Sequence, residues 1–138
     1  MTVQLATTLR NNMLNQYEST IGTTPKLILR SGSPPVDCAT ADSGTFLGII
    51  TLPSDWMAAA SGGSIAKSGT WTGTASASGT VGYYRLKDST ATSTDDTGTT
   101  YEQGSCGIGT GDLQLDNTSV TSGQNVTITT WSRTQGGA

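Results

Sequence analysis

The sequence contains no histidine among its 138 residues. Histidine is the commonest general base and a frequent metal ligand, so every Ser–His or Cys–His nucleophile arrangement is excluded. Acid–base chemistry would have to use carboxylates, and only two of these are glutamates, Glu18 and Glu102. We therefore expect a protein that is not an enzyme and that uses no cofactor or metal.

Charge is also scarce. Charged residues make up 12% of the chain, the net charge is -3, and the seven basic residues are scattered. No cationic stripe exists for a phosphate backbone, so we do not expect nucleic acid as a partner. No apolar run approaches the roughly 20 residues of a membrane helix, and residues 1–8 lack a secretory signal pattern. We expect synthesis in the cytoplasm of the cell that makes the protein, and no membrane partner.

Cysteine is nearly absent. Cys38 and Cys106 are far apart in the sequence and have neither metal-binding nor redox spacing. Synthesis in a reducing cytoplasm favours free thiols. A disulfide would require the fold to bring the two Cα atoms within about 7 Å.

Small polar residues are abundant instead. The chain has 26 Thr, 16 Ser and 18 Gly, while Trp, Tyr, Val, Ile and Leu are spread along its length. This mixture favours short strands joined by tight turns over disorder. A chain of this length fits one core, so we expect a single domain over residues 1–138.

An amphipathic helix is predicted over residues 3–21. Thr2 is a candidate N-cap and Gly22 a candidate stop. An apolar stripe runs every four residues through Leu5, Leu9, Met13, Tyr17 and Ile21, with Val3 and Leu14 beside them. The favoured interpretation is that this stripe packs on the chain's own sheet; the alternative is an arm that docks on a partner.

From residue 26 the pattern changes to short strands, and we predict a mainly β body over 26–134 with a flexible tail at 135–138. The last long strand should bury Val126 and Ile128, and Leu113 and Leu115 should face the core. A strand spacing near ten residues is typical of a β-sandwich, jelly roll or barrel, of which we favour a sandwich or jelly-roll-like domain. The expected strands are 26–30, 45–52, a hairpin of 64–68 with 70–77, 80–87, 100–106, 112–116 and 125–131.

Several motifs suggest chemistry only weakly. Asp95–Asp96 could begin a cation site, but neighbouring acids in a Ser/Thr loop are more often a solvated tip. Asp112 and Asp116 flank one short strand; a glycosidase-type carboxylate pair is the alternative to a structural role, in a chain with only two glutamates. The glycine run 107–111 leads into a strand and not a helix, so it reads as a turn and not a phosphate loop.

Aromatic residues offer one further binding hypothesis. Trp and Tyr side chains could stack on sugar rings, as in a carbohydrate-binding module, or they could fill the core of a domain with a single Phe. The residues concerned are Trp56, Trp71, Trp131, Tyr83 and Tyr84. Sequons at Asn117 and Asn125 match by chance in a Thr-rich chain without a secretory signal.

Taken together, the chain resembles small virion structural proteins of tailed phages. The resemblance covers most of the chain and rests on weak motifs. These are the helix with Leu5, Leu9-Arg10-Asn11, Leu14 and Ile21-Gly22; Lys26-Leu27 with Leu29; Thr45 with Leu47; Leu52-Pro53; 79–88; 103–105; Asp112-Leu113 with Leu115; and 117–120 before Gly123-Gln124 and 126–128.

Within that group the chain is most similar to capsid decoration, or cement, proteins. The resemblance implies a β-sandwich or jelly-roll domain on the capsid surface that bridges capsomers of the major capsid protein as a homodimer or homotrimer. A tail, neck or fibre component, or a carbohydrate-binding adhesion module, is the alternative. No catalytic, cofactor-binding or metal residue is implied, and the partner-binding residues are unknown.

Overall fold

The structure is a computed structural model that describes residues 2–92 and 97–137. It is mainly β with one helix, as the sequence predicts. The elements are α1 (Thr7–Ile21), β1 (Lys26–Arg30), β2 (Phe46–Thr51), β3 (Ser64–Ala66), β4 (Thr72–Thr74), β5 (Gly79–Thr80), β6 (Tyr83–Lys87), β7 (Thr100–Gly107), β8 (Leu113–Leu115), β9 (Ser119–Val120), β10 (Asn125–Thr130) and β11 (Ser132–Thr134).

One seven-stranded sheet forms the body, in the order β2-β1-β6-β7-β8-β10-β4. Its neighbours are antiparallel except for the parallel pair β7–β8. The two outer strands, β2 and β4, lie side by side, with a bridge between Gly48 and Ala75. The sheet therefore nearly closes on itself. This arrangement is nearer to a barrel than to the favoured sandwich or jelly roll, which is not confirmed.

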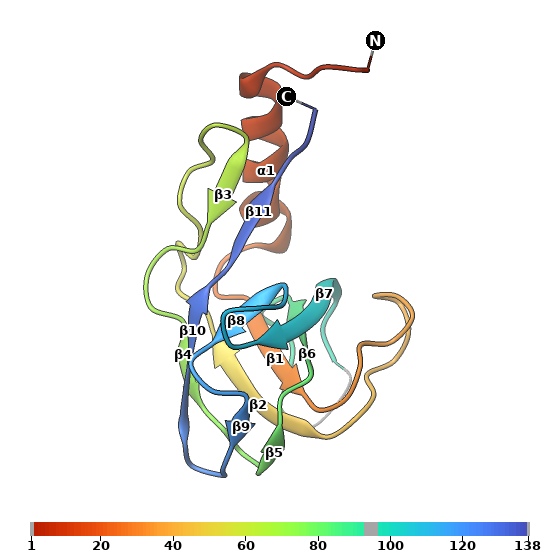
Figure 1. Ribbon diagram of the computed structural model, residues 1–138, viewed down its shortest axis with the longest axis vertical. Helices are drawn as coiled ribbons and strands as arrows, with labels where there is room; N and C mark the ends of the chain where they lie inside the picture. Colours follow the sequence, from red (N-terminus) through yellow and green to blue (C-terminus); the bar gives the residue numbers. More distant parts are fainter. Residues whose placement is uncertain (1, 93–96, 138) are drawn as a thin grey trace.

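Above the sheet, a smaller lobe contains α1, β3 and β11 (Figure 1). β10 continues through Trp131 into β11, which leaves the large sheet and pairs with β3. The helix packs against β3. The last strand thus joins the two parts of the molecule.

Buried aromatic rings fill the junction between these parts. Trp56, Trp71 and Trp131 are 0–2% exposed, and their ring centroids lie 5.7–6.2 Å apart. Tyr17 of α1 packs its ring edge-on against Trp131 at 5.9 Å. The predicted inward positions Val126, Ile128, Leu113 and Leu115 are all buried in the same core.

The helix begins four residues later than predicted, at Thr7 and not at residue 3. Ala6 is the N-cap, in an extended conformation, and the Leu5 N–H donates to the Gly137 carbonyl at 2.6 Å. This bond holds the chain outside the helical conformation, and Thr2 is not the cap. The predicted end is confirmed, because Gly22 caps the helix with φ 92°.

The buried face of the helix matches the prediction only in part, since Tyr17 and Ile21 of the predicted stripe pack on the core. Arg10, Leu14 and Ile21 are buried, whereas Leu9 and Met13 are 49% and 43% exposed. Polar residues on the inner side explain the rotation, since they accept hydrogen bonds from backbone N–H groups of residues 56–63. The pairs are Asn11 with Gly63, Asn15 with Ala60 and Glu18 with Trp56.

Two strand predictions are corrected. Segments 64–68 and 70–77 do not pair as a hairpin, because β3 pairs with β11 and β4 with β10. The expected strand 80–87 is divided into β5 and β6 at Gly82, whose backbone passes so close to Gly32 that a Cβ would lie 1.9 Å from the Gly32 oxygen. Gln135 and Gly137, expected in a flexible tail, both form backbone hydrogen bonds.

Candidate functional site

A polar cleft lies just before the start of β8, where no strand fills the space between its two neighbours. β8 lies between β7 and β10, but it begins only at Leu113, and the preceding chain turns away at Gly111 with φ 85°. Beyond that point β7 and β11 flank an open space of about 520 Å³. This volume lies within the usual range of small-molecule and peptide sites.

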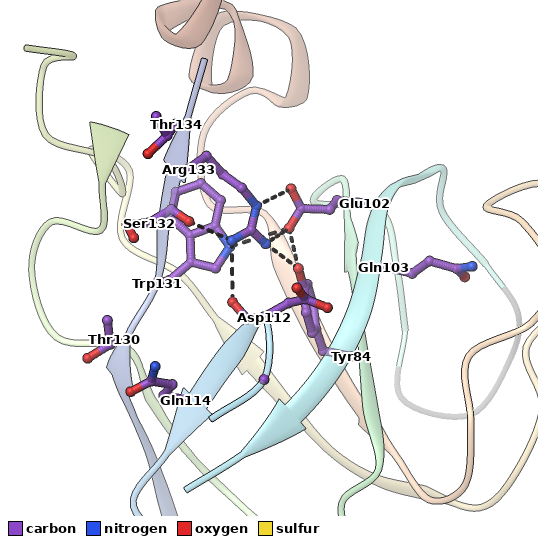
Figure 2. Close-up of a pocket in the computed structure, with 11 residues that line it drawn as sticks. Tyr84, Glu102, Gln103, Asp112, Gln114, Thr130, Trp131, Ser132, Arg133 and Thr134 are labelled. Carbon is purple, nitrogen blue, oxygen red and sulfur yellow. Dashed lines mark hydrogen bonds and ion pairs between the residues drawn. The ribbon is translucent and has the colours of Figure 1, made fainter. Parts of the chain in front are cut away.

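The floor of the cleft is an ion-pair cluster (Figure 2). Both Nε and Nη2 of Arg133 donate to the Glu102 carboxylate, with Nε to Oε2 at 3.0 Å. Glu102 Oε1 also accepts from the Tyr84 hydroxyl and, at 3.3 Å, from Trp131 Nε1. The Arg133 guanidinium lies over the Trp131 ring, 4.5 Å from its centroid. A charge pair, a phenol and an indole therefore close the inner side of the gap.

The environment raises the pKa of Tyr84 well above its ordinary value. Burial is the largest cause, and the neighbouring Glu102 charge and hydrogen bond add to it. The phenol therefore stays protonated and donates to the carboxylate. The Arg133 guanidinium keeps a raised pKa despite its burial, because Glu102 stabilises the positive form.

The cleft brings together two carboxylates, Glu102 and Asp112, that are ten residues apart in the sequence. Each has its own partners, since Asp112 Oδ2 accepts from the backbone N–H of Ser105 at 3.0 Å and from its hydroxyl at 3.1 Å. Asp116 lies at the other end of β8, where it accepts from the Thr127 N–H. Glu18 lies on α1, bonded to Trp56. The arrangement holds strands together through hydrogen bonds.

A second polar cluster lies on the opposite side of β6. Asp42, in the segment between β1 and β2, forms ion pairs with Arg30, Arg85 and Lys87 at 3.2, 2.8 and 3.0 Å. Arg85 and Lys87 are 1% exposed. The Tyr83 hydroxyl donates to the Ser43 carbonyl at 2.6 Å. This segment therefore covers the outer face of β6 with charge pairs, which explains why every residue of β6 is buried.

The aromatic residues that the sequence offered for sugar binding are buried. Because Trp56, Trp71 and Trp131 are buried, they present no ring face to a sugar and instead form core. Tyr83 and Tyr84 are likewise fully buried. The glycine run 107–111 forms the turn that leads into β8, as predicted. Asp95–Asp96 lie outside the described residues.

Both cysteines are free thiols in the structure, as predicted. Burial, aided by the nearby Asp112 charge, raises the pKa of Cys106 to about 12. The thiol is therefore protonated and a poor nucleophile at neutral pH. Among the described residues, no group of three or more acidic or cysteine side chains could hold a metal ion.

The comparisons give no identity. No protein-family model, no curated protein and no solved structure matches the chain. Within residues 2–92 and 97–137, no helix is long and apolar enough to cross a bilayer.

Sequence reasoning missed both charge clusters. Arg85 and Lys87 alternate on β6, which is a signal for two cations on one face, but nothing local places Asp42 above them. Arg133 and Glu102 are 31 residues apart on strands whose proximity depends on the curvature of the whole sheet.

Proposed function

We propose that the chain is a non-enzymatic virion structural protein that decorates and stabilises a phage capsid by binding the major capsid protein. The observation that carries the proposal is a pair of exposed apolar side chains on the upper lobe, Leu9 and Met13 of α1. Leu9 and Met13 are one turn apart on α1. Exposed apolar side chains on one helix face are typical of a helix that docks into a groove on another protein.

The rest of the surface suits repeated attachment to a lattice. With few charges and many Ser, Thr and Gly residues, it can pack closely against neighbours without strong repulsion. Many weakly attached copies gain stability through avidity. A decoration protein that binds the assembled shell better than the separated subunits resists disassembly by mass action.

The cleft chemistry supports a binding role over a catalytic one. Glu102 is engaged by Arg133, Tyr84 and Trp131, and Asp112 is engaged by Ser105. A general acid or base needs a free position near a substrate proton. A tail, neck or fibre component would share these features. Its position on the particle distinguishes it from a capsid decoration protein.

The test is binding of purified chain to shells that lack it. The wild-type chain should sediment with shells at a fixed ratio to capsomers, with modest dependence on salt. Leu9→Ser combined with Met13→Ser should weaken binding at least about tenfold, which corresponds to about 1.4 kcal/mol. Val36→Ser is the matched control, because Val36 is exposed but lies far along the chain between β1 and β2.

Two results would contradict the proposal. One is wild-type chain that fails to bind shells but binds isolated tails. The other is equal loss of binding for the helix variant and the Val36 control, which would mean that the helix face is not the contact.

A further inference from the structure

The cleft beside β8 is bordered by two strand edges with unpaired backbone groups. In the β6–β7 ladder, the Cys106 N–H donates to the Gly82 carbonyl, so by alternation the Gln103 backbone groups point away from β6. The same outward direction is visible at Ser105, whose carbonyl accepts from the Asp112 N–H. Gln103 lines the cleft, and β8 pairs with β7 only at Cys106 and Gly107, so no strand lies beside Gln103 on this side.

The opposite border has the same property. β11 bonds to β3 through residues 131, 133 and 135, since the Lys67 N–H donates to the Trp131 carbonyl and the Gln135 N–H to the Gly63 carbonyl. Ser132 and Thr134 therefore direct their backbone groups into the cleft. Arg133 Nη1 donates a hydrogen bond to the Ser132 carbonyl at 2.7 Å. The Ser132 N–H and the N–H and C=O of Thr134 are then left without a partner within the described part of the chain.

The space between these two edges lies where β8 would continue if it were extended at its N-terminal end. β8 pairs with β7 at Cys106–Leu113 and with β10 at Thr130–Gln114. Extended backwards from Leu113, the same line passes between the upstream half of β7 and β11. The inner side is already sealed by the Glu102–Arg133 cluster, so a strand placed here would cover polar side chains and would pair on both edges.

Neither edge beside the cleft carries proline or lysine, and the charged side chains on these strands, Glu102 and Arg133, are paired with each other. Natural sheets block free edges with proline, lysine or a covering segment. The outward side chains along the β10–β11 border are Thr130, Ser132 and Thr134, all exposed and uncharged. Such a border favours pairing with another extended segment.

A segment of suitable chemistry precedes α1. Residues 2–4, Thr-Val-Gln, are uncharged, have no helix or strand assignment, and make no hydrogen bond to the rest of the described chain. Val3 is 82% exposed although valine favours strands. Leu5, bonded to Gly137, fixes the point from which the segment leaves the molecule, and Figure 1 shows it running away from β11. Its unpaired backbone matches that of the cleft.

We propose that residues 2–4 of a second copy of this chain enter the cleft as an added strand between β7 and β11, so that the protein self-associates by strand donation. At about 3.3 Å per residue, three residues span about 10 Å, which matches the three-residue length of β11. Donation around a closed ring of two or three copies leaves no cleft empty. The inference rests on the backbone edges and is independent of capsid binding.

The experiment measures the mass of the full-length chain in solution against concentration, by sedimentation or light scattering. The wild type should form a discrete dimer or trimer. Val3→Pro removes the central N–H of the donated strand and should raise the midpoint concentration of assembly at least about tenfold. Val3→Ile, which keeps the N–H and the strand preference, should assemble as the wild type does.

A cross-link identifies the contact. Gln4→Cys combined with Ser132→Cys should give disulfide-linked dimers or trimers on mild oxidation, according to the size of the ring, whereas each single variant and the wild type, with Cys38 and Cys106 only, should not. A wild type that is monomeric at all concentrations would overturn the proposal, as would a Val3→Pro variant that assembles like the wild type. If the chain does not self-associate but binds shells normally, only the strand-donation proposal is rejected. If it self-associates but does not bind shells, only the capsid role is rejected.

Discussion

At the scale of single residues, Glu102 is the central polar group. It is partly shielded from water, with a side-chain exposure of 13%, and it accepts hydrogen bonds from three different side chains. Those side chains come from β6, β11 and the Trp131 link between β10 and β11. One carboxylate therefore ties together the strands on both sides of the cleft.

Replacing Glu102 with glutamine should lower the free energy of unfolding by about 2–3 kcal/mol. The amide keeps the shape of the side chain but leaves the Arg133 charge without its counter-ion in a largely buried position. Thermal and urea unfolding of Glu102→Gln measure the loss. Adding Arg133→Met should restore part of the stability, because the uncompensated charge is then removed.

Equal stability of Glu102→Gln and the wild type would show that the pair is solvated and contributes little, as most surface pairs do. A double variant that is less stable than Glu102→Gln alone would show that Arg133 acts mainly through its packing over Trp131.

Residue-level prediction from the sequence succeeded where a local pattern decided the outcome. Alternation placed Leu113, Leu115, Val126 and Ile128 in the core. It failed for ionic residues, because Arg133 meets Glu102 only through the curvature of the sheet and Arg85 meets Asp42 only where the segment between β1 and β2 covers β6. The candidate cleft could not be anticipated for the same reason.

At the scale of elements, the helix shows how a correct periodicity can predict the buried face only in part, since Tyr17 and Ile21 pack on the core but Leu9 and Met13 do not. The stripe through Leu9 and Met13 is real, but the neighbouring positions 11, 15 and 18 carry acceptors for the unpaired N–H groups of residues 56–63. Leaving such groups unpaired is costly when they are buried. Satisfying them turns Leu14 inward and leaves Leu9 outside.

This rotation gives a paired prediction on stability. Leu14 is 3% exposed, so Leu14→Asp buries a charge and should reduce the free energy of unfolding by more than about 3 kcal/mol. Leu9 is about half exposed, and Leu9→Asp should change the free energy of unfolding by no more than about 0.5 kcal/mol. Circular dichroism during thermal unfolding measures both. The opposite order would restore the predicted stripe as the packing face.

Strand pairing was harder to foresee than strand position. Most expected strands exist, including 26–30 with its bounds unchanged, and β6 pairs with the next long strand along the chain, β7. The local hairpin of 64–68 with 70–77 is wrong because each segment pairs with the last strands of the chain. Long-range pairing depends on the closure of the sheet, which no short window of sequence encodes.

At the scale of the whole molecule, two surfaces have different properties. The upper lobe exposes Leu9 and Met13, which we propose contact the capsid, and the cleft is bordered by the strand edges that we propose accept another copy of the chain. A particle component that joins its own copies and also grips a shell would bridge neighbouring capsomers. The two proposals are compatible, and each can fail alone.

The most direct test of the capsid role compares complete particles with particles assembled without this chain. If the chain decorates the shell, depleted particles should form with normal geometry but release their DNA at a lower temperature, and adding purified chain should restore the wild-type temperature. Depleted particles that resist heat as well as complete ones, yet fail to attach to host cells, would contradict the account.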